Sequence, residues 1–224
     1  MDIKTDLLEK GAILQRDRKT FAVVPHIPGG MLFDFNYLHK IADVAKKYGA
    51  KALKFTTSQR LAIVGIKPDD IDRVWAELGI PKGAASGLCV RSIRICPSTH
   101  FCKFAQQDAV TVGLALDERY HGMQLPSKFK MAVCGCMNSC TEPAVKDLGV
   151  MGTPKGYTIM IGGNAGIRPR VADMLVQNIP QEEVLPIVDK IVTYYKDNAR
   201  KYERLGKMID RLGFEKVKQD ILGE

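Results

Sequence analysis

Four of the six cysteines in this 224-residue chain form two pairs, and these pairs limit how the surrounding segments can fold. Cys96 and Cys102 have five residues between them, while Cys136 and Cys140 have three. A further 33 residues separate the two pairs. If all four thiols serve one site, the fold must bring two distant segments together.

Four cysteine thiolates are the ligands of a cubane iron–sulfur cluster. Structural zinc is a second interpretation, although zinc ligands in a pair are usually about two to four residues apart and the first pair is wider. Unliganded buried thiols are a third, and disulfides are a fourth that reducing compartments disfavour. The spacing favours the cluster and leaves the other interpretations open. Cys89 and Cys134, outside the pairs, are expected in the core.

Both pairs are expected at the ends of secondary structure elements. Cys102 precedes a helix predicted over residues 104–116, whose first backbone N–H groups would stabilise a thiolate. Cys136 and Cys140 enclose a short loop after a strand predicted over residues 129–134. Such positions leave the thiols accessible to a cofactor.

Residues 1–82 predict a small unit of mixed strands and helices. Strands are expected over residues 20–25, 50–56 and 60–66, and helices over 34–49 and 68–78. This arrangement resembles half of a ferredoxin-like fold. Gly79, Pro81 and Gly83 mark a break in the pattern, so we place a domain boundary after residue 82.

Residues 83–224 predict a second unit, which makes the chain an α+β protein. Strands are expected over residues 88–95, 129–134 and 157–161, and helices over 104–116, 168–176, 182–204 and 207–222. The glycine-rich segment 162–166 would connect a strand to a helix, where backbone N–H groups can hold carboxylates or phosphates. A simple turn is the alternative, since the spacing is not that of a dinucleotide-binding loop.

The charge of the chain suggests an anionic ligand and argues against nucleic acid. There are 33 basic and 25 acidic residues, a net charge of +8, with no run of five or six basic residues. Apolar runs are far shorter than the roughly 18 residues that span a bilayer, and no targeting segment is recognisable. We therefore expect a cytoplasmic protein with neither a membrane nor a nucleic-acid partner.

Five basic residues lie where they can surround an anion. Lys128 and Lys130 begin a predicted strand and project from the same face. Arg60 follows a polar loop, and Arg91 and Arg94 lie on another predicted strand. Each alone is consistent with a solvated surface charge. Together they indicate a site for a small oxyanion, which needs cations to hold it and to supply protons during reduction.

These motifs resemble those of the sirohaem and [4Fe–4S] nitrite/sulfite reductase family over about residues 20–215. The shared features, in family order, are Thr56–Arg60, the first cysteine pair, Lys128-Phe129-Lys130 and the second cysteine pair. Within the family, the chain is most similar to the small, single-repeat assimilatory-type sulfite reductases and to the sirohaem part of NADH-dependent nitrite reductase. The resemblance implies a ferredoxin-like half domain followed by an α/β domain that binds sirohaem and a [4Fe–4S] cluster. The implied reaction is six-electron reduction of sulfite to sulfide or of nitrite to ammonia.

The resemblance also assigns roles to residues at matching positions. The implied cluster ligands are Cys96, Cys102, Cys136 and Cys140, with Cys140 also bridging to the sirohaem iron. The residues implied to hold the oxyanion and supply protons are Arg60, Arg91, Lys128 and Lys130. Weaker candidates for contacts with the macrocycle or the cluster surroundings are Thr57, Gln59, Arg94, Asn138, Gly163 and Asn164.

The substrate stays open between sulfite and nitrite. Ser58 stands where larger sulfite reductases carry an arginine, and the order Gln59-Arg60 is that of the nitrite-reductase-like branch. No flavin or nicotinamide site is recognisable, so the resemblance implies an external electron donor such as a ferredoxin or a flavoprotein. Larger relatives contain two copies of this unit, which predicts a homodimer here.

Two other functional classes fit parts of the pattern. An iron–sulfur electron-transfer subunit without sirohaem would need the cysteines but not Lys130, so replacing Lys130 by Met would leave its function intact. A zinc-stabilised nucleic-acid binder would fit the positive charge, and its affinity would fall steeply with salt. The chain has no basic patch with interleaved aromatic residues to favour such a binder.

Overall fold

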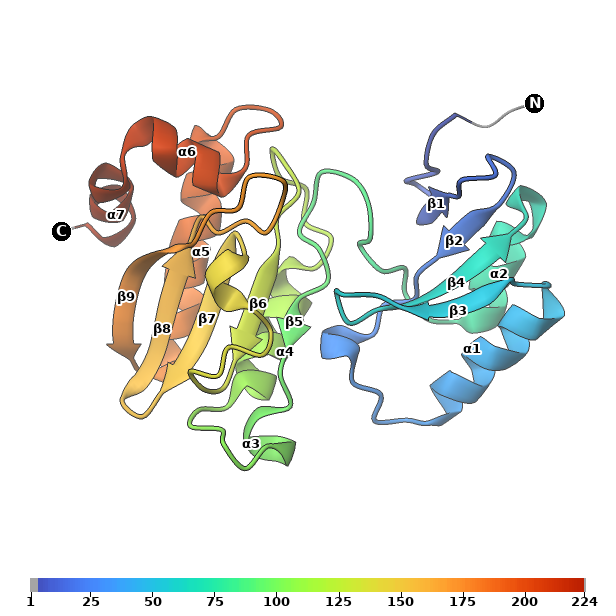
Figure 1. The fold of residues 1–224 in the computed structure, drawn as a ribbon, viewed down its shortest axis with the longest axis horizontal. Helices are drawn as coiled ribbons and strands as arrows, with labels where there is room; N and C mark the ends of the chain where they lie inside the picture. The colour runs from blue at the N-terminus through green and yellow to red at the C-terminus, as the bar shows by residue number, and fades with distance from the viewer. Residues whose placement is uncertain (1–3, 224) are drawn as a thin grey trace. The chain divides into compact units, whose positions relative to one another are not determined.

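The computed structural model describes residues 4–223, which divide into two compact units at Gly87 and Leu88. The sequence places this boundary slightly earlier, after residue 82. Each unit has its own sheet and its own helices (Figure 1), and the expected α+β class is confirmed. Across residues 4–223, every helix is too short or too polar to cross a membrane.

The first unit is a four-stranded antiparallel sheet with two helices. Its strands, in spatial order, are β1 (Ala12–Leu14), β2 (Phe21–Val23), β4 (Leu61–Ile66) and β3 (Ala52–Phe55). The helices are α1 (Asn36–Lys47) and α2 (Ile71–Leu78), and the short helical turns are η1 (Pro28–Gly30) and η2 (Pro68–Asp70).

Apolar periodicity explains the core of the first unit. Ile41, Val44 and Ala45 are buried on one side of α1, because residues three and four apart share a helix face. They join Phe21 and Ile63 from the sheet in one hydrophobic cluster. The predicted helices and the two later strands of this unit are confirmed with slightly shorter bounds, whereas β1 was not predicted.

The second unit contains a five-stranded mixed sheet. Its strands, in spatial order, are β5 (Arg94–Ile95), β6 (Met131–Cys134), β7 (Leu148–Thr153), β8 (Gly156–Ile161) and β9 (Asp173–Ile179). The pairs β5–β6 and β6–β7 are parallel, and the pairs β7–β8 and β8–β9 are antiparallel. Strand β7 was not predicted from the sequence.

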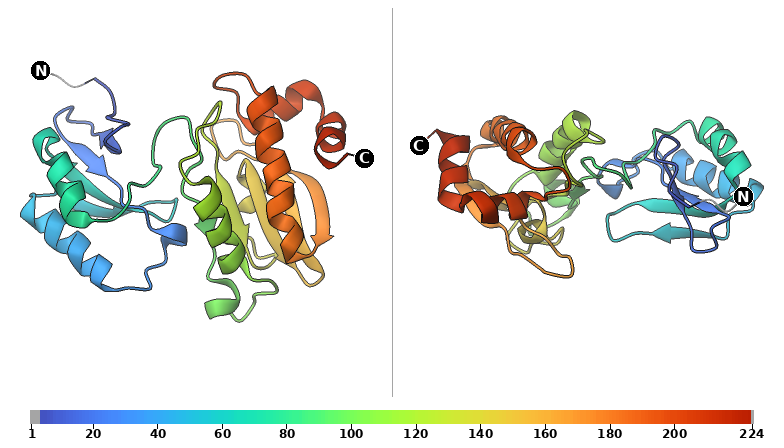
Figure 2. Two further views of the ribbon diagram at one scale, coloured as in Figure 1. Left: turned by 180° about the vertical axis from the view of Figure 1, so that it is seen from behind. Right: turned by 90° about the horizontal axis from the view of Figure 1, so that it is seen from above.

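Two of the five α-helices of the second unit cover one face of its sheet. The five helices are α3 (Ser98–Phe101), α4 (Ala109–Tyr120), α5 (Gln181–Asn198), α6 (Leu205–Leu212) and α7 (Phe214–Leu222). Helices α4 and α5 cover one face, and the short turn η3 (Pro143–Val145) lies on the other (Figures 1 and 2). Gly149 of β7 allows this close packing, since an added Cβ atom would lie 2.4 Å from the Pro143 carbonyl oxygen.

The predicted helix over residues 168–176 is wrong. The chain reverses after β8 because the backbones of Asn164 and Arg170 exchange two hydrogen bonds of 2.8 Å each. Strand β9 then pairs with β8, with Val176 opposite Ile159. Pairing with an open sheet edge satisfies the backbone groups of this segment, so the tertiary fold overrides its local pattern.

Three other predicted helix boundaries need correction. Helix α4 begins at Ala109 rather than residue 104, because the Asp108 carboxylate accepts hydrogen bonds from the N–H groups of Val110 and Thr111. Helix α5 ends at Asn198, before residue 204. The predicted helix 207–222 is two helices, which Gly213 separates with a positive φ of 88°.

Candidate functional site

Parallel pairing of β5 and β6 brings the two cysteine-containing segments together. Ile95 pairs with Val133, and the N–H of Cys96 donates to the Val133 carbonyl oxygen at 3.1 Å. The next residues on the two strands are Cys96 and Cys134, whose thiols form a hydrogen bond. Cys136 follows two residues later, so the first cysteine of each pair comes from one of two adjacent strand ends.

Gly135 holds the two cysteine segments in contact. Its N–H donates to the Sγ atom of Cys96 at 3.1 Å, and its carbonyl oxygen accepts the N–H groups of Gln106 and Gln107 at 2.8 and 3.0 Å. An added Cβ atom would lie only 2.3 Å from the Ser98 hydroxyl oxygen. A glycine is therefore required at this position for the segments to approach.

The predicted position of Cys102 at the start of a helix is wrong. Cys102 instead follows the short helix α3, and its N–H donates to the Ser98 carbonyl oxygen at 2.7 Å. The next helix begins seven residues later at Ala109. Backbone N–H groups of a helix N-terminus therefore do not stabilise this thiol. The helix start was misplaced because the cap, Asp108, lies inside the segment 104–116 that was predicted to be helical.

The thiols affect one another's pKa values. The hydrogen bond with Cys134, together with burial, raises the pKa of Cys96, and the same bond lowers the pKa of Cys134. Burial raises the pKa of Cys140, and the neighbouring Cys134, Cys136 and Cys102 raise it further. Five thiols therefore lie within electrostatic range, one more than the two predicted pairs contain. Cys96 and Cys136 are buried, whereas Cys140 is exposed.

This group of thiols fits a cubane iron–sulfur cluster. The cysteines carry no disulfide among residues 4–223, and thiolate sulfur is the donor that such a cluster uses. The N–H donated to Cys96 Sγ is the kind of hydrogen bond that tunes cluster potentials. Over the same residues, no three His, Cys, Asp or Glu side chains converge on one metal ion. Cubane ligands each bind a different iron, so they surround a volume rather than a point.

The predicted lysines lie at the other end of β6, on the face opposite α4 and α5. Phe129 is fully buried, whereas Lys128 and Lys130 on either side of it are exposed, so the two lysines share a face as predicted. Phe129 also pairs in parallel with Val90, which places Arg91 and Lys130 next to each other on that face. The side chain of Lys130 as a whole is exposed, but partial burial of its ammonium group, together with Arg204 and Lys128, lowers its pKa.

A buried ion pair fixes the backbone beneath Lys130. Arg204 donates two hydrogen bonds to the carboxylate of Asp147, at 2.7 and 2.6 Å, and Asp147 is fully buried. The same carboxylate accepts the N–H of Lys130 at 2.7 Å. Burial raises the pKa of Asp147, and Arg204 opposes that shift. Arg204 Nη1 also donates to Asn164 Oδ1 at 3.3 Å, which connects this pair to the glycine-rich loop.

Arg94 belongs to a second group of charges, in which the carboxylate of Glu142 is exposed and Lys146 is buried. It donates to Glu142 at 2.6 Å, and Lys146 contacts the same carboxylate at 3.1 Å. These two cations, Arg94 first, hold the pKa of Glu142 below its usual range. The Nε atom of Arg94 is buried with no hydrogen-bond partner among residues 4–223, so its N–H can donate to a ligand atom. Asn138 is exposed in the loop between Cys136 and Cys140.

The predicted Gly163 and Asn164 line a pocket of about 580 Å³ together with Lys128. Gly163 is in close contact with the backbone of Lys146, where an added Cβ atom would lie 2.6 Å from the carbonyl oxygen. The loop connects two strands, so the predicted strand-to-helix connection is wrong. The helix that lines the pocket is instead α6, whose first turn contributes Gly206 and Lys207.

Three predicted residues, Thr57, Gln59 and Arg60, lie in the first unit at the turn between β3 and β4. Arg60 precedes β4, and its N–H donates to the Thr56 hydroxyl at 3.2 Å. Gln59 has a positive φ of 55°, and an added Cβ atom at Gly30 would lie 2.7 Å from its carbonyl oxygen. Gly30 therefore allows η1 to support the predicted turn.

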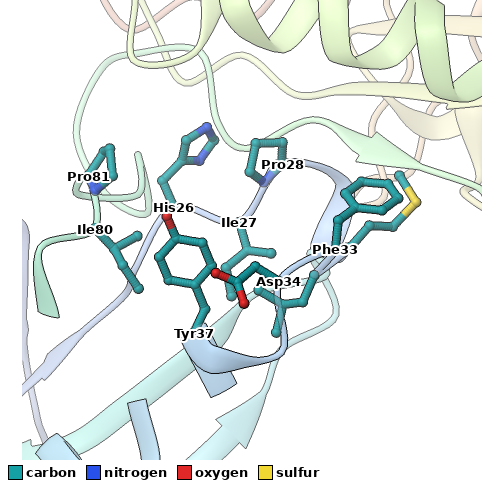
Figure 3. A pocket seen from close by; sticks show the side chains of 10 residues that line it. His26, Ile27, Pro28, Phe33, Asp34, Tyr37, Ile80 and Pro81 are labelled. Carbon is teal, nitrogen blue, oxygen red and sulfur yellow. The ribbon is translucent and has the colours of Figure 1, made fainter. Parts of the chain in front are cut away.

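The first unit also contains an apolar pocket of about 400 Å³ (Figure 3). Tyr37 and Asp34, near the start of α1, face Ile80 and Pro81, which follow α2. His26 lies beside them, and its backbone N–H donates to the Pro81 carbonyl oxygen at 2.8 Å. None of the residues predicted for the site lines this pocket.

Sequence reasoning missed the acidic and basic partners that organise the site. Asp147 and Arg204 are 57 residues apart, and Arg204 was placed inside a predicted helix. The available signal at Asp147 was a charged pair, Lys146-Asp147, immediately before an apolar segment. No signal in the sequence pairs Arg204 with Asp147.

Comparison with known proteins gives matches over nearly the whole chain. Residues 86–224 match the family described as "Nitrite and sulphite reductase 4Fe-4S domain", and residues 13–79 match "Nitrite/Sulfite reductase ferredoxin-like half domain". The assimilatory-type sulfite reductase of Nitratidesulfovibrio vulgaris is 39% identical over 96% of this chain and 98% of its own length. A nitrite reductase [NAD(P)H] of Bacillus subtilis is 37% identical over 95% of this chain, which covers 26% of that relative.

Solved structures show the same fold. A dissimilatory sulfite reductase I superposes with a TM-score of 0.82 and 18% identity, over 90% of this chain and 69% of the other. At that identity the likeness concerns the fold alone.

Proposed function

Because the chain belongs to the nitrite and sulphite reductase family, an oxidoreductase family, we propose that it reduces sulfite to sulfide. The reaction takes six electrons, and the oxygen atoms of sulfite leave as water. One observation carries the choice of sulfite: the relative that matches along its whole length is named as a sulfite reductase. Family membership also implies a [4Fe–4S] cluster and sirohaem as cofactors.

We propose that Cys96, Cys102, Cys136 and Cys140 bind the cluster. The parallel pairing of β5 and β6 supports this set, because it joins the two segments that carry the thiols. Cys140 is the proposed shared ligand of the cluster and the sirohaem iron. Its support is exposure, since Cys140 is the exposed member of the four and is accessible to a second group.

Sirohaem would supply an iron that binds the oxyanion and passes electrons to it. The chain's own residues would hold the macrocycle: Thr57, Gln59, Arg94, Asn138, Gly163 and Asn164 are the proposed contacts. The unpartnered Nε atom of Arg94 and the pocket beside Asn164 fit a cofactor that carries carboxylates. Both features provide hydrogen-bond donors for anionic groups.

Lys130 is the proposed principal proton donor to the oxyanion. Burial and the neighbouring cations Arg204 and Lys128 lower its pKa, so it releases a proton more readily than an ordinary lysine. Arg91 and Lys128, on the same face, would hold the anion through charge. Arg60, in the first unit, is a fourth proposed contact that rests on the family resemblance.

The absorption spectrum and turnover of the purified holoprotein test this function. We expect a haem-type spectrum that shifts when sulfite is added, and a kcat/KM for sulfite at least about tenfold above that for nitrite, with reduced methyl viologen as donor. A protein without haem-type absorption contradicts the proposal. Higher kcat/KM for nitrite would favour the second candidate, nitrite reduction, which the Gln59-Arg60 order and the Bacillus relative support.

We also propose a homodimer that receives electrons from an external ferredoxin or flavoprotein in the cytoplasm, where reducing conditions keep the cluster thiols free. No nucleic acid is among the proposed partners. Equilibrium ultracentrifugation of the active holoprotein tests the dimer. A fully active monomer would contradict it.

A further inference from the structure

The pocket of about 580 Å³ in the second unit is lined by cations from separate elements. Arg168 comes from the loop between β8 and β9, and Lys207 comes from the first turn of α6. Within residues 4–223, neither side chain has a hydrogen-bond or ion-pair partner. By contrast, Arg170 and Arg204 in the same pocket are both paired with carboxylates. Asp210 also lines the pocket but is paired with Arg170. Within the same residues, Arg168 and Lys207 therefore line it as cations without a carboxylate partner.

The backbone segments that carry Arg168 and Lys207 are closely packed. An added Cβ atom at Gly206 would lie 2.2 Å from the Gly162 carbonyl oxygen, so α6 touches the end of β8. The loop that bears Arg168 is closed by the two backbone hydrogen bonds between Asn164 and Arg170. Because this backbone is already ordered, an anion would bind with only a small entropy cost for ordering the pocket.

The size of the pocket indicates an organic anion. Pockets of roughly 300–1,000 Å³ hold organic ligands, whereas one sulfite ion would leave most of this space unfilled. Cations on different elements suit negative groups that are spaced apart on one rigid molecule. Among the ligands of the proposed reaction, sirohaem has this chemistry, with carboxylates around the rim of a flat macrocycle.

We infer that Arg168 and Lys207 bind peripheral carboxylates of sirohaem. This inference rests on the proposed function and adds two residues that the sequence motifs do not indicate. The first-turn N–H groups of α6 have no side-chain cap, so they add donors beside Lys207. Arg204 acts differently, because its guanidinium is engaged by Asp147.

The test compares sirohaem retention in the full-length holoprotein and in the double variant Arg168→Gln/Lys207→Gln. Both are purified from a host that makes sirohaem, and sirohaem, iron and sulfide per chain are measured after gel filtration at low and high salt. We expect the double variant to release sirohaem about tenfold faster, since two charge-assisted contacts are lost. Its cluster iron and sulfide should remain at the wild-type level. Lys155→Gln, at the opposite end of β8, is the matched control and should retain sirohaem normally.

Each outcome has a distinct meaning. Wild-type protein that contains no sirohaem would overturn the proposed function and this inference with it. Normal wild-type content with equal retention in the double variant would overturn this inference alone. Equal retention with a raised KM for sulfite would also overturn it, because the pocket would then serve the substrate. If circular dichroism shows that the double variant is unfolded, the single variants and Arg168→Lys decide, and Arg168→Lys should retain sirohaem better than Arg168→Gln.

Discussion

The two ends of strand β6 carry different chemistry and are held by different interactions. At the cysteine end, hydrogen bonds through the Gly135 backbone join the two thiol-bearing segments. At the lysine end, a buried ion pair between Asp147 and Arg204 fixes the backbone of Lys130. Lys130 and Cys134 are only about 13 Å apart along the strand. The thiol end is therefore held by strand pairing and backbone hydrogen bonds, whereas the lysine end depends in addition on a buried ion pair.

Because of this difference, the two ends of β6 should respond differently to substitution. Strand pairing persists when a thiol is changed, so loss of a cysteine should remove the cofactor and leave the fold. A buried carboxylate without its cation is costly, so loss of Arg204 should weaken the fold itself. The predictions below test this contrast, from the largest expected effect to the smallest.

Replacing Cys96 by Ser should abolish sulfite turnover and remove most cluster iron, because a hydroxyl is a poor substitute for a thiolate ligand. Stability of the apoprotein should change little, since the backbone pairing of β5 and β6 remains. Iron and sulfide analysis and thermal unfolding are the measurements. Cys89→Ala is the matched control: Cys89 is also buried but lies outside the cysteine pairs, and this variant should keep its cluster. A Cys96→Ser protein with full cluster content would remove Cys96 from the ligand set.

Replacing Arg204 by Gln should lower the free energy of unfolding by about 3–5 kcal/mol at pH 7, because it leaves the fully buried Asp147 carboxylate without its cation. Burial already raises the pKa of Asp147, and loss of Arg204 raises it further. The destabilisation should therefore shrink as pH falls and the carboxyl takes up a proton. Urea unfolding at pH 7 and pH 5 measures this. Arg211→Gln, which breaks a more exposed pair with Glu203, is the control and should cost less.

Replacing Lys130 by Met should reduce kcat for sulfite by about 100-fold, the usual range for loss of a proton donor. In the wild type, activity should fall on the alkaline side at a pH below the ordinary lysine pKa of 10.5. Partial burial and the positive charges of Arg204, Lys128 and Lys146 lower the pKa of Lys130 and outweigh the attraction of Asp147. Lys130→Arg keeps the positive charge but should lose most of the activity as Lys130→Met does, since arginine stays charged and does not release a proton. A Lys130→Arg variant with the kcat of the wild type would contradict the proton-donor role.

Replacing Glu142 by Gln should cost only about 0.5 kcal/mol, because its carboxylate is more than half exposed. Arg94 and Lys146 lower the pKa of Glu142, so the stability from this group is present above its ordinary pKa of 4.5 and is lost as pH falls below it. The wild type and the variant should therefore differ at pH 7 and converge under acid. A loss comparable to that of Arg204→Gln would show that exposed charges matter as much as buried ones here.

Much of the site could be predicted because its signals are local. The cysteine spacing, the alternation around Phe129 and the glycine-rich segment are each read within a few residues. The helix over 168–176 failed, since its residues pair instead with the edge of β8, and an edge is a property of the assembled sheet. The predicted start of the helix after Cys102 was wrong because Asp108 caps the helix four residues after the predicted first residue.

The sequence by itself determined the expected chemistry of this protein. It contains four thiols in two pairs, a lysine pair, and motifs in an order that implies reduction of an oxyanion. These depend on residue types and short spacings, which survive without a fold. Only the tertiary structure decided which charges are available. It engages Arg204 with Asp147 and, within residues 4–223, leaves the side chains of Arg168 and Lys207 without partners, because residues far apart in the chain meet only after the sheet and α6 have packed.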